Sequence, residues 1–184
     1  ADRYAEDVVA AIDAFGPDVV VSQELLFGVV AAAESLGRRV ALFAANVWSF
    51  PTLPNAPPFG GGLPPPKTEF DFDFYGRVTR ATQAAFQYGL PALNAVRAGL
   101  GLAPLADLFD QLKAADRILL ATSRAFDFDQ TPPEPYHYVG PYLADPVWTG
   151  DWRPPWLADD RRPLVLVSFS TMYQAQEAVL RARL

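Results

Sequence analysis

The stretch between Pro17 and Trp48 constrains the fold more than any other part of the chain. It contains two short apolar runs, 19–22 and 40–45, which flank an apolar segment of helix length, 25–36. Two runs of strand length around such a segment are typical of a β-strand, α-helix, β-strand unit with parallel strands. Runs without polar alternation indicate strands that are buried on both faces. The sequence therefore predicts an α/β fold with a Rossmann-like parallel sheet and flanking helices.

In such sheets, ligands bind beyond the carboxyl ends of the strands. The first predicted strand ends in Ser22, Gln23 and Glu24, and the second runs into residues 45–48. Because parallel strands end at the same edge, we expect these residues to form the functional edge of the sheet.

Apolar periodicity and helix breakers define the remaining predicted elements. In the segment 71–99, the stripe of Phe74, Val78, Ala81, Ala85 and Tyr88 is expected to pack inward. The predicted helices are 2–15, 71–99 with a break near Gln87, and 104–112; the predicted strands are 117–121, 136–139 and 163–168.

A long loop rich in proline and glycine follows Trp48. Loops of this length in compact domains are usually functional or disordered. Trp48, Phe50 and Phe59 suggest that it forms a wall or lid over a pocket. The alternative is an ordered surface loop that its aromatic side chains hold in place.

Composition excludes several classes of function. The formal charge of −6 over 184 residues argues against nucleic-acid binding, which needs clustered basic residues. With one histidine and no cysteine, a zinc site is not expected. The absence of cysteine favours a cytoplasmic protein. Helical patterns run to both ends of the chain, so we expect it to be part of a longer protein with flanking segments.

Several segments of the sequence resemble a known family. PDVVVSQELLFGVVAAAESLG, followed by AANVWSFP and PPFGGGL, resembles the second half of the acceptor domain in GT-B glycosyltransferases. The most similar group is the macrolide-type, or UDP-glucuronosyl/glucosyltransferase-like, family. YHYVGPYLADPVW resembles the end of that domain with its linker, and RRPLVLVSFST resembles the opening of the donor domain. The resemblance implies an acceptor-domain portion at 1–140, a linker at 141–162 and the start of the nucleotide-sugar domain at 163–184.

The resemblance also implies an activity. Enzymes of this family transfer a hexose from a nucleotide-diphosphate sugar to an acceptor hydroxyl, with inversion. The nucleotide sugar is a co-substrate, and neither a further cofactor nor a metal is expected. The general base is a histidine near the N-terminus of the full protein, outside this chain. An acidic residue orients that base.

The position of this acidic residue falls on Gln23. Glutamine accepts a hydrogen bond from an imidazole N–H but cannot balance an imidazolium charge. Glu24 is adjacent, although neighbours along an extended segment point to opposite sides. Either a weaker histidine–glutamine pair operates, or another residue orients the base, or activity is low. His137 is expected to be structural.

The remaining site residues are also carried over from the resemblance. Ser170 and Thr171 match the small polar loop that touches the donor nucleotide. The expected acceptor contacts are Phe27, Asn46, Trp48, Phe50 and Phe72, and they suit a flat, apolar acceptor. The alternative from another class is a non-catalytic, Rossmann-like module that binds small molecules, and the uncharged Gln23 keeps this alternative open.

Overall fold

The computed structural model describes residues 2–53, 56–58, 62–128, 133–142 and 161–163, together with residues 144, 150, 153 and 181. The chain divides into two compact units, residues 1–143 and 144–184. The elements below belong to the first unit. Residues 164–168 of the predicted strand 163–168 lie outside the described residues, as do Ser170, Thr171 and Phe59.

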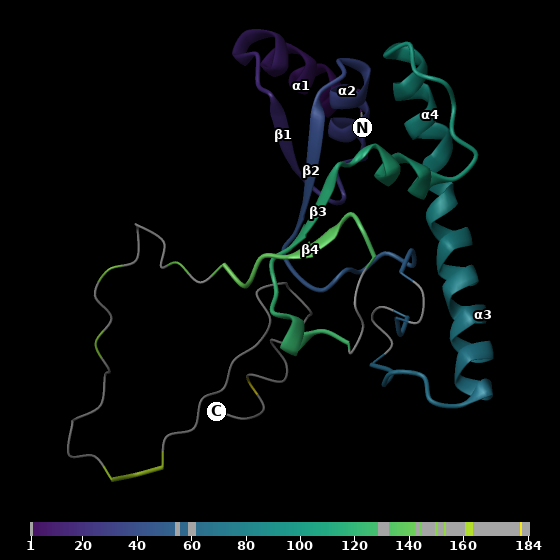
Figure 1. The fold of residues 1–184 in the computed structure, drawn as a ribbon, viewed down its shortest axis with the longest axis vertical. Coiled ribbons are helices and arrows are strands. Elements are labelled where there is room, and N and C mark those ends of the chain that lie inside the picture. Colours follow the sequence, from purple (N-terminus) through teal and green to yellow (C-terminus); the bar gives the residue numbers. More distant parts are fainter. Residues whose placement is uncertain are drawn as a thin grey trace. The chain divides into compact units, whose positions relative to one another are not determined.

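The first unit alternates helices and strands (Figure 1). In chain order the elements are α1 (Asp2–Phe15), β1 (Val19–Gln23), α2 (Phe27–Ser35), β2 (Arg39–Ala44), α3 (Glu69–Phe86), the short 3-10 helix η1 (Gln87–Gly89), α4 (Leu90–Gly99), the 3-10 helix η2 (Leu108–Ala114), β3 (Arg117–Leu120), the 3-10 turn η3 (Arg124–Phe126) and β4 (Tyr136–Tyr138).

The four strands form one sheet in the order β1-β2-β3-β4. All neighbouring pairs are parallel, with Val19 opposite Arg39 at the start of the first pair. α2 connects β1 to β2, so the predicted strand, helix, strand unit is present. The prediction of an α/β fold with a parallel sheet and flanking helices is confirmed.

Local sequence signals account for most helix boundaries. α1 ends at Phe15 and is followed by Gly16, whose φ of 59° is left-handed, and then by Pro17. α3 begins with a capping box: Thr68 Oγ1 accepts from the Asp71 N–H at 3.2 Å, and Asp71 Oδ2 accepts from the Thr68 N–H at 2.9 Å. The long helical segment breaks at η1, just before Pro91, as predicted from the proline.

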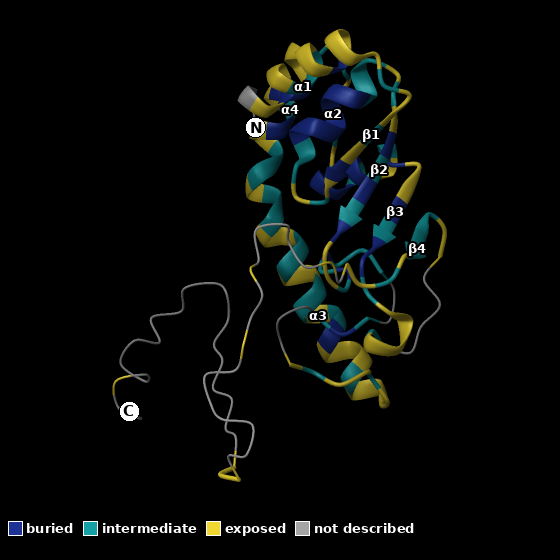
Figure 2. Ribbon diagram, turned by 90° about the vertical axis from the view of Figure 1, so that its left-hand side faces the viewer, coloured by how far each residue is buried: buried dark blue, intermediate teal, exposed yellow. Residues whose placement is uncertain are grey.

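The expectation that the strands are buried on both faces is wrong for the described residues. Along β1, Val19 is 47% and Val21 is 64% exposed, whereas Ser22 is buried. β2 alternates in the same way, with Val40 and Leu42 buried on one side. The sheet therefore has a covered face, toward α2 and η2, and an open face (Figure 2).

The face of α3 that packs inward differs from the predicted stripe. Phe74, Ala81, Ala85 and Tyr88 are exposed, and only Val78 of the five is half-buried. The side that packs inward contains buried Tyr75 and, three helical turns further on, half-buried Phe86. Successive residues lie about 100° apart around a helix. The observed stripe is shifted by one residue from the predicted one, so the buried face is turned by about 100° around the helix.

The predicted helix 104–112 begins later and has a different form. Pro104 lies in irregular backbone, and the 3-10 helix η2 starts at Leu108. Asp107 is its N-cap, because the Asp107 carboxylate accepts from the Phe109 N–H at 2.7 Å. The N-cap aspartate outweighs the preference of proline for the first helical position.

A buried polar cluster joins three of the helices on the covered side. The Arg97 guanidinium, on α4, donates to both carboxylate oxygens of Glu34 on α2, at 2.8 and 3.2 Å. It also donates to Gln111 Oε1 on η2 at 2.7 Å. Arg97 is only 4% exposed and Gln111 only 1%. Because each polar group has a partner, the cluster fixes how α2, α4 and η2 pack.

Candidate site at the carboxyl edge of the sheet

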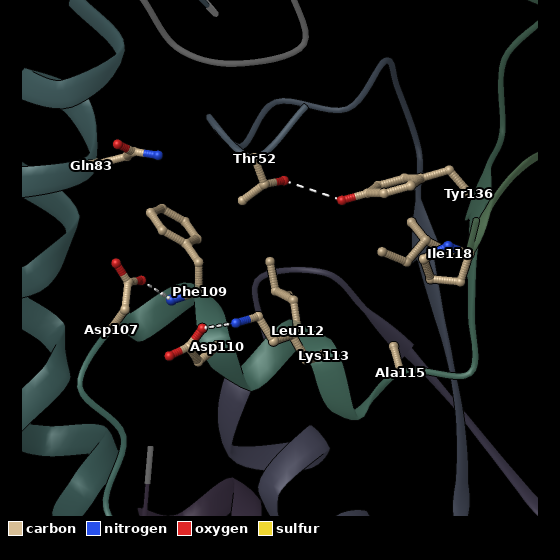
Figure 3. Close-up of a pocket in the computed structure, with 11 residues that line it drawn as sticks. Thr52, Gln83, Asp107, Phe109, Asp110, Leu112, Lys113, Ala115, Ile118 and Tyr136 are labelled. Carbon is tan, nitrogen blue, oxygen red and sulfur yellow. Dashed lines mark hydrogen bonds and ion pairs between the residues drawn. The ribbon is translucent and has the colours of Figure 1, made fainter. Parts of the chain in front are cut away.

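Described residues of the first unit line a larger and a smaller cavity, both of ligand size. The larger, about 560 Å³, lies beside η2 and the beginnings of β3 and β4 (Figure 3). The smaller, about 390 Å³, lies where β1 leads into α2. Small-molecule sites in proteins commonly have volumes of about 300–1,000 Å³. The smaller cavity adjoins the predicted functional edge.

Apolar side chains form nearly all of the wall of the smaller cavity. Leu25 and Phe27 come from the segment that joins β1 to α2. Phe86 and Tyr88 come from the junction of α3 with α4, and Tyr4 from α1. Among the described residues, no charged side chain lines this cavity. Its chemistry therefore suits an uncharged, apolar molecule.

Gln23 is the last residue of β1 and is exposed. Its Oε1 accepts a hydrogen bond from the Leu25 N–H at 3.1 Å. The amide oxygen therefore supports the turn between β1 and α2, and the side-chain NH2 group remains available as a donor. A role for Gln23 in orienting a catalytic base stays a prediction.

Glu24 is a candidate that the sequence reasoning set aside. Its Oε2 atom is buried and has no hydrogen-bond partner among the described residues. Burial raises the pKa of the Glu24 carboxyl, and a hydrogen bond from its own backbone N–H only partly opposes that effect. Carboxyl groups with raised pKa values are enriched at functional sites, so Glu24 is a candidate site residue. In the sequence, the position of Glu24 next to Gln23 is the feature that could have identified it as a candidate.

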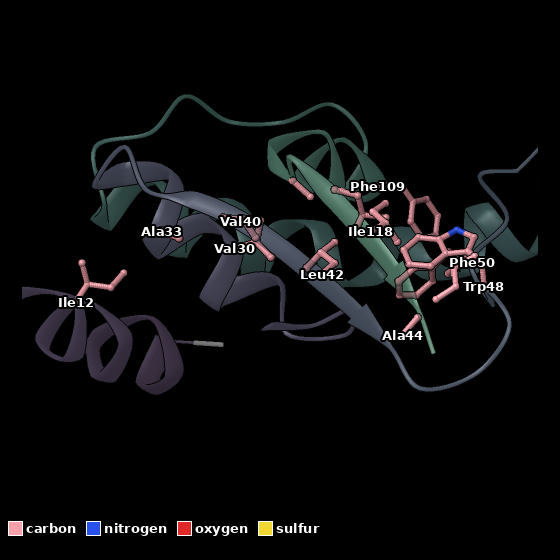
Figure 4. Close-up of a cluster of buried hydrophobic side chains, with 13 residues drawn as sticks. Ile12, Val30, Ala33, Val40, Leu42, Ala44, Trp48, Phe50, Phe109 and Ile118 are labelled. Carbon is pink, nitrogen blue, oxygen red and sulfur yellow. The ribbon is translucent and has the colours of Figure 1, made fainter. Parts of the chain in front are cut away.

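Trp48 and Phe50 belong to the core and are 7% and 4% exposed. Figure 4 shows both rings within the cluster of buried hydrophobic side chains. The two rings meet edge to face at a centroid distance of 5.2 Å, and Trp48 Nε1 donates to Thr52 Oγ1 at 2.7 Å. The space beside them, next to Pro57 and Thr82, measures only about 30 Å³. The two buried rings therefore pack onto the core and do not form a lid; Phe59 lies outside the described residues, and acceptor contacts by Trp48 and Phe50 stay predictions. The aromatic side chains hold the loop in place, which was the alternative.

The other expected acceptor contacts are divided in space. Phe27 is half-buried, lines the apolar cavity and lies 5.8 Å from the Phe50 ring. Asn46 is exposed just beyond β2. Phe72 is 50% exposed in the first turns of α3, beside a stacked pair formed by Phe70 and Phe74 at 6.2 Å. The Phe50 ring contacts both the Phe27 ring and the Trp48 ring. The described ring pairs do not include Phe72.

His137 lies on β4, opposite Leu119 of β3. Its Nε2 atom is 3.1 Å from Glu134 Oε2 and is buried.

Within the described residues, no three histidine, aspartate or glutamate side chains gather as a metal site. No described helix is long and apolar enough to cross a membrane.

Comparison with known proteins gives a relative. No protein-family model matches the chain. The 4'-demethylrebeccamycin synthase of Lentzea aerocolonigenes is 27% identical over 186 residues, which cover 95% of this chain and 42% of that protein. Among solved structures, the glycotransferase of kitacinnamycin matches with a TM-score of 0.45 and 19% identity, over 84% of this chain and 38% of that one.

The chain spans less than half the length of either protein. Its parallel sheet with flanking helices defines a Rossmann-like class of domain, and over nearly its whole length the chain is similar to part of the synthase. The resemblance to glycosyltransferases predicted from sequence is confirmed by the sequence match, which covers part of that protein.

Proposed function

We propose that this chain is part of a GT-B glycosyltransferase, which transfers a hexose from a nucleotide-diphosphate sugar to a hydroxyl of an apolar small molecule, with inversion. The observation that carries the proposal is the 27% identity to a named synthase, which extends through 95% of the chain. The parallel sheet, with an apolar cavity beside the carboxyl end of β1, supports it.

In this proposal, residues 1–140 belong to the acceptor domain, 141–162 to the linker and 163–184 to the donor domain. Ser170 and Thr171 contact the nucleotide. The reaction takes place in the cytoplasm and uses the nucleotide sugar as co-substrate, without a further cofactor or a metal. The flanking segments of the same protein supply the rest of both sites.

The cavity that contains Phe27 is the proposed acceptor site. Its apolar wall, which includes Leu25 and Tyr88, removes a flat acceptor from water. The acceptor hydroxyl faces Gln23 and Glu24 at the carboxyl end of β1. In the transfer, the hydroxyl oxygen attacks the anomeric carbon, a base takes the hydroxyl proton, and the nucleotide diphosphate leaves with the electrons of the broken bond. Gln23 or Glu24 orients that base.

The test is transfer by the complete protein that contains this chain. A panel of nucleotide sugars is incubated with apolar aromatic alcohols, and products are sought by mass spectrometry. We expect an acceptor enlarged by one hexose with the complete protein and none with the 184-residue chain. Transfer by the chain alone would contradict the placement of the base outside it.

The second candidate is a binding module that has lost catalysis, and the exposed, uncharged Gln23 favours it. This candidate predicts that the complete protein binds apolar alcohols, yet gives no hexosylated product with any nucleotide sugar. Calorimetry of acceptor binding, run beside the transfer assay, separates the two functions.

A further inference from the structure

The larger cavity is separate from the carboxyl edge. Ala115 and Ile118 lie at the start of β3, and Pro135 and Tyr136 at the start of β4. Gln23, in contrast, closes the carboxyl end of β1. The proposed transfer reaction makes no use of this cavity.

One side of the larger cavity is apolar. Phe109, Leu112 and Ile118 are 7%, 6% and 2% exposed. Their side chains belong to the core and form one apolar wall of the cavity. Tyr136 is half-buried, and its hydroxyl lies 3.1 Å from Thr52 Oγ1, which also accepts from Trp48 Nε1. This chain of hydrogen bonds holds the Tyr136 ring in place as part of the wall.

The other side of the cavity is acidic. Figure 3 shows Asp107 and Asp110 across the cavity from Tyr136 and Ile118. Both aspartates are half-buried, whereas Lys113, which pairs with Asp110, is 79% exposed at its side chain. Asp107 uses one oxygen to cap η2, and its other oxygen makes no hydrogen bond that the described structure shows.

Two carboxylates and one ammonium leave this side with one excess negative charge. A ligand that fills the cavity contacts the apolar wall at one end and lies close to this negative charge at the other. A protonated amine near Asp107 would be attracted, and an anion would be repelled, in a setting where both carboxylates are partly removed from water.

We propose that the larger cavity binds an apolar ring molecule that carries a protonated amine. The ring packs on Ile118, Phe109 and the Tyr136 ring, and the ammonium group lies against Asp107. The volume of about 560 Å³ is in the range of small-molecule sites. This site stands independently of the proposed glycosyl transfer, because its residues take no part in that reaction.

The test uses a matched pair of probes and the 184-residue chain. 2-(1-Naphthyl)ethylamine and 2-(1-naphthyl)ethanol share a ring system and differ in charge. Binding is followed through the backbone amide signals of the isotopically labelled chain. We expect the amine to bind about three- to fivefold more tightly than the alcohol, as for a partly exposed ion pair, with the largest shifts at Phe109, Lys113 and Tyr136.

Asp107→Asn removes the charge and keeps a side-chain oxygen that caps η2. We expect it to abolish the preference for the amine while binding of the alcohol is unchanged. Asp110→Asn provides a second, independent variant with a smaller expected loss. The matched control is Asp73→Asn, which alters an exposed carboxylate on α3 and should leave the preference intact.

Three results would overturn the proposal: equal affinities for the two probes, shifts confined to residues outside the cavity, or an unchanged preference in the Asp107→Asn variant. Failure of glycosyl transfer in the complete protein would leave these binding results as they are. The two proposals therefore fail separately.

Discussion

The two faces of the parallel sheet have similar sequences and different surroundings. On the covered face, Leu42 and Leu120 are fully buried against α2 and η2. On the open face, Val21 is 64% exposed, and Phe43 makes an edge contact with the largely exposed Tyr142 at 5.9 Å. Apolar side chains on both faces are typical of strands that are buried on both sides. The apolar strand sequences predict burial of both faces of the sheet, whereas the described residues cover only one face.

The largest expected effect lies in the buried cluster beside the covered face. Arg97→Ala removes a guanidinium that is 4% exposed and leaves Glu34 and Gln111 without their main partner. Breaking such a pair costs about 3–5 kcal/mol. Urea unfolding followed by circular dichroism measures the loss. The matched control, Arg77→Ala, removes a pair on exposed α3 and should cost under about 1 kcal/mol.

The second prediction compares the two faces directly. Leu42→Ala should destabilise the chain by about 2–5 kcal/mol, because it leaves a cavity in the core. Val21→Ala should cost less than about 1 kcal/mol, since that side chain is already mostly in water. Equal losses for the two variants in the same urea experiment would show that the open face is covered in solution.

The next two predictions concern the pH dependence of stability. Burial acts to raise the pKa of the Glu34 carboxyl, but hydrogen bonds from Arg97 and Gln111 and the charge of Arg97 outweigh it, so the pKa is lowered. A lowered pKa means that Glu34 stabilises the fold above its usual value of 4.5, and that this contribution is lost as the pH falls through the folded-state pKa. Glu34→Gln should reduce stability at neutral pH and flatten its decline in acid.

Glu24 at the carboxyl edge should behave in the opposite way. Because burial raises its pKa, the folded state disfavours the ionised form, and stability falls as the pH rises through the interval above 4.5. Glu24→Gln should therefore raise stability slightly at neutral pH. Unfolding midpoints at pH 4 and pH 7 measure both effects, and a loss of stability at pH 7 in Glu24→Gln would contradict the raised pKa.

The sequence predicted where elements begin and end better than it predicted which sides they bury. The apolar runs and the stops at Gly16 and Gly37 placed α1, β1, α2 and β2 within two residues. The inner face of α3 was missed because Phe70, Phe72, Phe74 and Tyr75 place aromatic rings on several sides of one helix. Periodicity alone then gives no unique inner face.

At the candidate site, the sequence identified the carboxyl edge of the sheet but not the burial or local conformation of each residue there. Trp48 and Phe50 were expected at a pocket because they follow a strand end, yet the loop folds back and buries both rings. Glu24 was set aside on the geometry of an extended segment, whereas it lies in the turn after β1. The cavity around Asp107 joins segments distant in sequence, so no local pattern indicated it.

The most direct test of the central claim is the acceptor KM of the complete protein with Leu25→Asp. This change places a charge in the apolar cavity at a side chain that is 55% exposed, so the fold should tolerate it. Val19→Asp, at a similarly exposed valine at the amino end of β1, is the matched control. We predict that Leu25→Asp raises the acceptor KM about tenfold, with the nucleotide-sugar KM unchanged and with little effect of Val19→Asp. An unchanged acceptor KM in Leu25→Asp would contradict the placement of the acceptor in this cavity.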